Sequence, residues 1–247
     1  MKNRWVLVGL ALILAGVFFI DYVAELLYPS VELGPVRIPD TLGGAHTYNF
    51  YKDTSFVGTY NYSVAKVPGG AQGVVYAMRS VISITFGGKP LTLEGLYRFN
   101  SGFSPVSYGL NATEGDEITY YVCDFKPGAV TTSVSFKGET VDVETELDEG
   151  TLLIENSMPG YWEILFQSTS LDRGKRYTFD AFIPQAAKVF HVTLVVEKDL
   201  EQVRVEDGTL ECTVIKASDL GLSFYVYQGE IVQYRNEEQG VLMNKVS

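Results

Sequence analysis

Apolar and polar residues alternate along most of the chain after His46. A period of two places successive side chains on opposite faces of a strand, so each predicted strand has one apolar and one polar face. Gly-containing turn signals such as Gly87-Gly88, Lys137-Gly138 and Asp207-Gly208 separate the alternating runs. This spacing predicts a meander of long antiparallel strands. The clearest runs cover residues 74–86, 130–136, 141–147, 190–196 and 210–214.

One stretch breaks this alternation and predicts the main helix of the domain, over residues 159–171. Ser157 and Pro159 are typical of a helix start, and Asp172-Arg173-Gly174 would end the helix. Its large apolar side chains favour packing in the core over a surface position. Such a helix would close the mouth, or fill the concave face, of a curved sheet. The fold expected for residues 45–247 is therefore a single mainly β domain, an open half-barrel with one main helix.

The first 28 residues predict one N-terminal transmembrane helix. Residues 5–20 carry no charge and no proline, and the apolar pattern continues to Tyr28, where Pro29 would stop the helix. Lys2 and Arg4 precede the span, so this signal-anchor would leave its N-terminus in the cytoplasm and residues 30–247 outside the cell membrane. A cleaved signal peptide is the alternative, although no good cleavage site follows the apolar core. Residues 29–44, with three prolines and three glycines, predict a stalk.

Charge and cysteine content narrow the function classes. The formal net charge of −11 would repel nucleic acid, and no basic cluster offsets it. Cys123 and Cys212 either form a disulfide, which an extracytoplasmic location would permit, or remain two buried free thiols. Asn61 and Asn111 each begin an N-glycosylation tripeptide, whose use depends on the source organism.

Catalytic signals are weak, so we expect no enzyme, no cofactor and no metal. The chain has no nucleophile elbow, phosphate-binding loop or His-Glu-x-x-His motif. Of its two histidines, His46 begins the first strand and His191 lies in a strand. The acidic row Asp142, Glu144 and Glu146 would share one strand face. Alternate residues on a strand lie about 6.5–7 Å apart, too far to share one ion without loop ligands.

The C-terminal half resembles a family of uncharacterised extracytoplasmic domains. The order is a helix (YWEILFQSTSL), a strand entered through a glycine (DRGKRYTFDAFI), a second strand (KVFHVTLVVEK), a third (EQVRVEDGTLECTVIKA), and a final hairpin (LSFYVYQGEIVQYRNEEQGVLMNKV). This order over residues 150–247 is similar to the half-barrels of lipoprotein carriers and lipoprotein receptors. The resemblance implies a curved sheet that holds an acyl chain or other apolar ligand. An uncleaved anchor departs from those carriers, because a tethered protein cannot ferry cargo freely.

Two functions remain open at this point. The first is a membrane-anchored binding protein that holds a lipid or other apolar molecule in the half-barrel, in a cavity lined by Trp162, Phe166, Tyr177 and Phe179. The second is a non-catalytic interaction or assembly subunit that docks onto a membrane-protein partner through a sheet face or edge.

Overall fold

The computed structural model describes residues 28–68, 74–155, 157–206 and 208–246. The predicted anchor lies outside these residues, except for Tyr28. Within the described ranges, no helix has the length and apolar character needed to cross a membrane.

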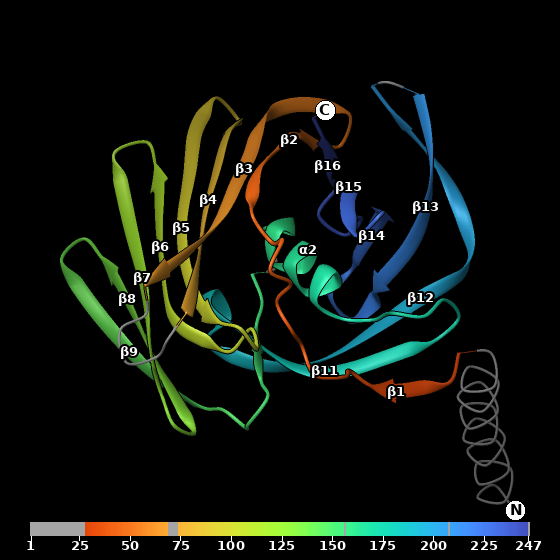
Figure 1. Cartoon of the computed structure of the whole chain (residues 1–247). Helices are drawn as coiled ribbons and strands as arrows, with labels where there is room; N and C mark the ends of the chain where they lie inside the picture. The colour runs from red at the N-terminus through yellow and green to blue at the C-terminus, as the bar shows by residue number, and fades with distance from the viewer. Residues whose placement is uncertain (1–27, 69–73, 156, 207, 247) are drawn as a thin grey trace, which may run out of the picture.

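A single curved sheet forms the body of the molecule (Figure 1). Its strand order is β1-β11-β12-β13-β14-β15-β16-β2-β3-β4-β5-β6-β7-β8-β9, and β10 also pairs with β11. Neighbouring strands are antiparallel except for β1 and β10, which pair with β11 in parallel. The two end strands, β1 and β9, do not pair with each other, so the described sheet does not close. The strands are β1 (Ser30–Glu32), β2 (Gly44–Lys52), β3 (Ser55–Pro68), β4 (Val74–Phe86), β5 (Lys89–Asn100), β6 (Pro105–Glu114), β7 (Glu117–Lys126), β8 (Ala129–Phe136), β9 (Glu139–Glu146), β10 (Leu152–Leu153), β11 (Arg176–Ile183), β12 (Lys188–Val205), β13 (Gly208–Ala217), β14 (Leu222–Tyr227), β15 (Glu230–Asn236) and β16 (Val241–Lys245).

The alternating runs form strands as predicted, and their apolar positions face the core. In β4, Tyr76, Met78 and Ile82 are all buried on the concave face, opposite Phe99, Tyr97 and Leu93 of β5. The predicted turn at Lys137-Gly138 joins β8 to β9, and both of its residues have positive φ, 51° and 84°. The pattern of polar and apolar positions therefore predicts where the strands lie and which of their side chains face the core.

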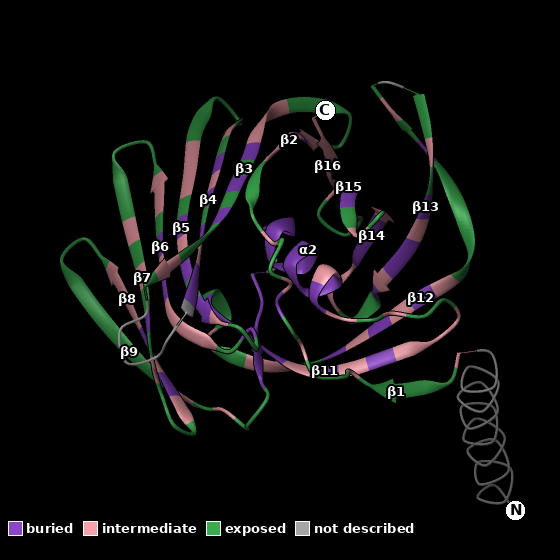
Figure 2. Cartoon of the chain, viewed as in Figure 1, coloured by how far each residue is buried: buried purple, intermediate pink, exposed green. Residues whose placement is uncertain are grey.

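Helix α2 (Pro159–Ser168) lies inside the curve of the sheet, surrounded by strands (Figures 1 and 2). Every residue of α2 except Gln167 is buried, so the helix belongs to the core and not to the surface. The helix fills the concave face, one of the two positions expected for it. The other helical segments that the structure describes are two short 3-10 turns, η2 (Pro184–Ala186) and η3 (Ser218–Leu220).

Residues 29–44 do not form a stalk, and this corrects the prediction from composition. Strand β1 pairs with β11, and the Leu33 amide donates to the Thr178 carbonyl at 3.1 Å. Further along, the Ile38 amide donates to the Ser101 carbonyl at 3.0 Å, and the Ile38 side chain is buried. These contacts satisfy backbone groups that a free stalk would leave to water. The segment is thus an integral part of the domain.

Both cysteines are free and buried. Cys123 lies on β7 in the main core, with its Sγ 3.5 Å from Oγ1 of Thr132. Cys212 lies on β13 in a smaller, separate apolar cluster with Val203 and Val214. Of the two alternatives left open by the sequence, the structure has the pair of buried thiols.

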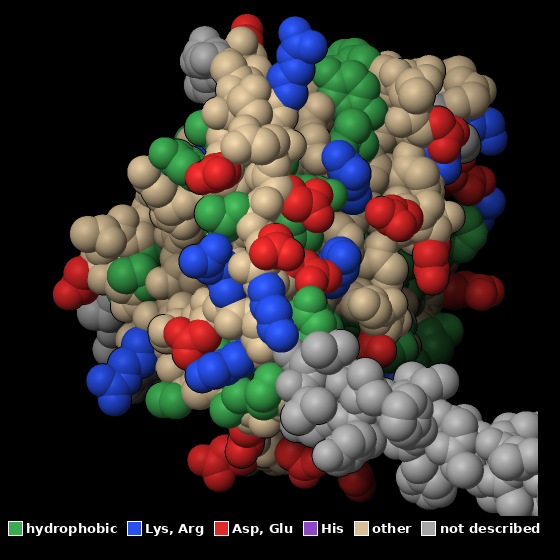
Figure 3. Space-filling view, turned by 90° about the vertical axis from the view of Figure 1, so that its right-hand side faces the viewer, with side chains coloured by type: hydrophobic (Ala, Val, Ile, Leu, Met, Phe, Trp, Pro, Cys, Tyr) green, Lys and Arg blue, Asp and Glu red, His purple; other side chains and the backbone are tan. Residues whose placement is uncertain are grey.

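The face over β12 and β13 carries basic and acidic side chains next to one another (Figure 3). One such pair joins Lys216 Nζ to Glu197 Oε1 at 2.8 Å. This interleaving offers no basic stripe for a nucleic acid backbone.

Candidate functional site

A buried carboxylate lies at the centre of the half-barrel. Glu163 projects from α2, and its side chain is 1% exposed. Its Oε2 accepts hydrogen bonds from the Tyr48 hydroxyl at 2.6 Å and from the Ile231 amide at 2.9 Å. Its Oε1 accepts one from the Tyr62 hydroxyl at 2.6 Å. Strands β2, β3 and β15 therefore each donate to one helical glutamate, which compensates for the loss of its hydration.

His46 lies next to this carboxylate, near the start of β2. Its Nδ1 is 3.4 Å from Oε1 of Glu163, and its ring stacks on Tyr62 with centroids 4.7 Å apart and planes 3° apart. Burial lowers the pKa of His46, with the Glu163 carboxylate acting in the opposite direction. Nδ1 is buried and makes no hydrogen bond to any described residue.

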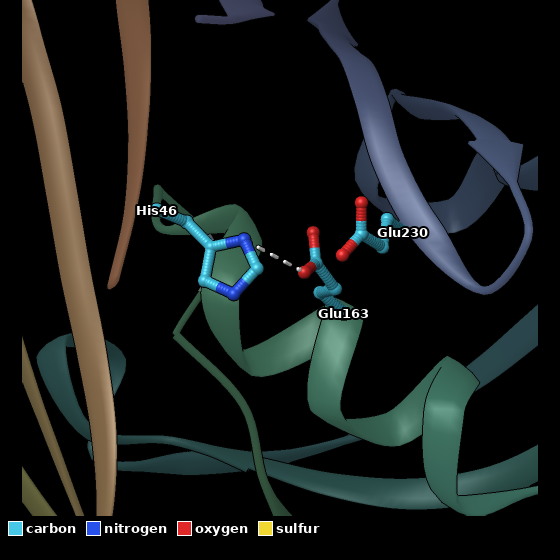
Figure 4. A group of neighbouring side chains, drawn as sticks. All are labelled: His46, Glu163 and Glu230. Carbon is cyan, nitrogen blue, oxygen red and sulfur yellow. Dashed lines mark ion pairs between the residues drawn. The ribbon is translucent and has the colours of Figure 1, made fainter. Parts of the chain in front are cut away.

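Glu230, the first residue of β15, completes a group of three side chains (Figure 4). One nitrogen of His46 and one carboxylate oxygen from each glutamate lie within 4.8 Å of one another. The Glu230 side chain is 48% exposed, and its Oε2 lies 2.8 Å from Nζ of Lys245. An imidazole and two carboxylates are ligands that divalent transition metals accept. The sequence did not predict this group, because its members come from three distant parts of the chain.

A second buried carboxyl group, that of Glu155, lies just before α2. Its Oε2 accepts a hydrogen bond from the Tyr108 hydroxyl at 2.7 Å and one from the Gln185 side-chain amide. Burial raises the pKa of Glu155, although these hydrogen bonds act in the opposite direction. The interior thus holds two glutamates, each bound by tyrosine.

An apolar trough of about 410 Å³ opens on the concave face, beside the start of α2. Ile82 and Ile84 of β4 lie beside their register partners Leu93 and Leu91 of β5, and the four side chains line the trough together. Ile84, Leu91 and Leu93 are only half-buried. Nine apolar or aromatic residues and three polar ones line the trough: Phe50, Val57, Ile82, Ile84, Leu91, Leu93, Tyr234, Val241 and Met243, with Lys52, Ser157 and Gln239.

The four residues predicted to bind a ligand are buried in the structure, and none of them lines the trough. Trp162 and Phe166 pack against Phe224, with ring centroids 5.0 and 5.1 Å apart. The Tyr177 hydroxyl accepts a hydrogen bond from the Asp172 amide at 2.7 Å. Phe179 borders a different depression of about 590 Å³.

His191 and the acidic row lie apart from these features. Nδ1 of His191 is 2.9 Å from Oδ1 of Asp180 on the surface, where the histidine side chain is 66% exposed. Asp142 and Glu144 are exposed on β9, as expected for a solvated strand face.

Comparisons with known proteins give one structural likeness. No protein-family model matches the chain, and no curated protein matches it significantly. A crystal structure of a β-barrel-like protein of a domain of unknown function, DUF1849, from Brucella abortus aligns with a TM-score of 0.45 and 14% sequence identity. The alignment covers 87% of this chain and 96% of that one. The likeness does not bear on function, and the expected resemblance to lipoprotein carriers and receptors is not confirmed.

Proposed function

We propose that this protein is a non-catalytic binding protein that holds a lipid acyl chain or another apolar molecule in the trough. The observation that carries the proposal is the trough itself: an apolar hollow of about 410 Å³ on the concave face of a half-barrel. Small-molecule sites have volumes of about 300–1,000 Å³, and they are mostly apolar with a few polar groups. Lys52, Ser157 and Gln239 would supply those polar groups.

The position of α2 explains why the trough is open. The helix covers the concave face where Tyr60 and Tyr62 meet Gly160, but Ser157, just before the helix, already borders the trough. Beyond that point, no helix that the structure describes covers the apolar side chains of β4 and β5. A ligand would bury these half-exposed side chains, and each Å² of apolar surface removed from water contributes about 25 cal/mol.

The expected membrane anchor would keep this binding domain close to its own membrane. Residues 29–44 pack on the barrel and leave little free linker, and the Tyr28 hydroxyl donates to Oε2 of Glu197 on β12 at 2.6 Å. A domain held in this way would take an apolar ligand from, or present it to, the adjacent membrane surface.

Binding of a fluorescent fatty acid, cis-parinaric acid, to a detergent-free chain beginning at Tyr28 tests the proposal. We expect saturable binding by the wild type. Ile84→Glu and Leu93→Glu should each weaken it by at least about tenfold, because a carboxylate in the trough must be desolvated when the ligand enters. The matched control is Val122→Glu, at a position on β7 that is 54% exposed on the convex face. Absence of binding by the folded wild type, or equal weakening by the control, would contradict the proposal.

A second candidate function rests on the exposed apolar side chains of β9. Val141 and Val143 lie on one face of this strand and are 62% and 39% exposed, and β9 lies at the end of the strand order. Exposed apolar side chains and a free strand edge are features of a docking surface. In this alternative, the domain binds a membrane-protein partner. A crosslink to that partner should form in native membranes, and Val141→Lys should abolish it. Fatty acid binding should be unchanged in Val141→Lys. Recovery of the monomer alone from wild-type membranes would count against docking.

A further inference from the structure

We propose that His46, Glu163 and Glu230 bind one divalent transition-metal ion, through Nδ1 of the histidine and one oxygen of each carboxylate. This site lies on the side of α2 that faces β2 and β15, and none of its three residues lines the trough. The inference is therefore independent of apolar ligand binding.

The spacing of the first two ligand atoms fits a shared ion. Nδ1 of His46 and Oε1 of Glu163 are 3.4 Å apart. Two ligand atoms, each about 2.1 Å from a tetrahedral metal, are separated by about 3.4 Å. With one oxygen of Glu230 included, one ligand atom from each of the three residues lies within 4.8 Å of the others. The Glu230 side chain is 48% exposed, so a rotation of its carboxylate can close the remaining gap without moving the core.

The unpartnered Nδ1 of His46 is the independent sign of a missing ligand. This nitrogen is buried and has no hydrogen-bond partner among the described residues, although it faces a carboxylate. A buried polar atom left without a partner is destabilising, and such atoms are rare in folded proteins. An ion at this point would satisfy the nitrogen.

The residues around the group resemble the supporting shell of a metal site. Tyr48 and Tyr62 hold the Glu163 carboxylate at 2.6 Å each, which fixes the direction of its oxygens. Lys245 binds Oε2 of Glu230 at 2.8 Å, leaving the other oxygen for the ion. The half-exposed Glu230 side chain connects the site to solvent, which gives an ion access to the buried ligand atoms. An imidazole ligand favours Zn²⁺ and the later transition-metal ions over Mn²⁺, Ca²⁺ and Mg²⁺, which prefer oxygen ligands.

Isothermal titration of the full-length, untagged protein with ZnCl₂, after removal of bound metal with a chelator, tests the site. We expect one Zn²⁺ to bind per chain. Co²⁺ should compete for the same site and form a complex with a visible absorption band. His46→Asn and Glu230→Gln should each weaken the affinity by about 10–100-fold. His191→Asn is the matched control, because it removes the other histidine of the chain together with its surface Asp180 contact.

Three results would overturn the proposal: no stoichiometric Zn²⁺ binding by the wild type, unchanged affinity in His46→Asn, or equal loss in His191→Asn. If His46→Asn unfolds, as judged by circular dichroism, Glu230→Gln decides, because its half-exposed side chain can be changed without opening the core. Titration with MgCl₂ should give no comparable binding. Because cis-parinaric acid binding reports on the trough alone, failure of either proposal leaves the other standing.

Discussion

At the scale of single residues, the interior is organised by tyrosine hydroxyls that bind glutamate. A buried carboxylate is tolerated only when donors replace its water, and Tyr48, Tyr62 and Tyr108 supply them. The sequence shows many tyrosines in strand patterns, which predicts aromatic packing on a sheet face. It does not show which tyrosine meets which glutamate, because each pair joins a strand to a segment far along the chain.

Glu155 gives a prediction about stability and pH. Its pKa is raised by burial from an ordinary value of 4.5. The folded state therefore binds its proton more tightly than the unfolded state does. The stabilisation is complete below pH 4.5 and is lost as the pH rises through the elevated folded-state value. We expect the free energy of unfolding of Glu155→Gln to fall less steeply with rising pH than that of the wild type. Urea denaturation from pH 4 to pH 8 measures both slopes.

The control for this change is Glu117→Gln, since Glu117 is 55% exposed at the surface. In Glu117→Gln, the free energy of unfolding should depend on pH with the same slope as in the wild type. A Glu155→Gln slope equal to that of the wild type would show that the buried carboxyl group does not control this part of the pH dependence.

At the scale of elements, α2 shows where prediction from sequence succeeds and where it stops. Its start at Pro159 was predicted, because proline fits the first turn of a helix. Its end is Ser168, three residues before the predicted one. The Thr169 hydroxyl donates to the Leu165 carbonyl at 2.7 Å, and the Ser168 carbonyl accepts the Arg37 amide at 3.0 Å. This second contact comes from residues 29–44, and a local sequence pattern cannot reveal it.

Gly160 allows α2 to pack closely against β3, and this contact gives a prediction about stability. A Cβ at this position would lie 2.6 Å from the Tyr60 hydroxyl and 2.9 Å from the Tyr62 ring. Gly160→Ala should therefore destabilise the protein by about 1–3 kcal/mol through overpacking, despite the gain of about 1 kcal/mol in helix propensity. Thermal and urea unfolding measure the change. Gly34→Ala is the control, since no atom lies within 4 Å of its Cβ position. Equal stability of the two variants would show that α2 does not pack closely against β3 at Gly160.

At the scale of the whole molecule, the pattern of the chain predicts an open curved sheet with one helix in its concavity, and the structure has this architecture. Two features escaped prediction. The packing of residues 29–44 depends on parallel pairing with β11, which proline and glycine content cannot indicate. The trough depends on where α2 begins, because the strands beyond that point have no helix packed on them. Its lining residues alternate like any other strand residues, so their sequence does not distinguish them from core.

Truncation tests whether residues 29–44 belong to the domain. A chain beginning at Tyr28 should unfold at the same urea concentration as the full-length protein. A chain beginning at Ala45 should lose at least about 3 kcal/mol, because it loses buried Ile38 and the backbone hydrogen bonds from Leu33, Arg37 and Ile38. Equal midpoints for the two truncated chains would mean that the segment is a stalk after all.

The place of β16 in the sheet determines when the half-barrel can be completed during synthesis. Strand β16 pairs with β15 on one side and with β2 on the other, so it joins the later strands β11–β15 to the earlier strands β2–β9. Until residues 241–245 leave the ribosome, the edge of β2 stays open, and the concave face lacks part of its cover. Open strand edges and bare apolar faces promote aggregation. We therefore expect nascent chains that stop before β16 to depend most on chaperones.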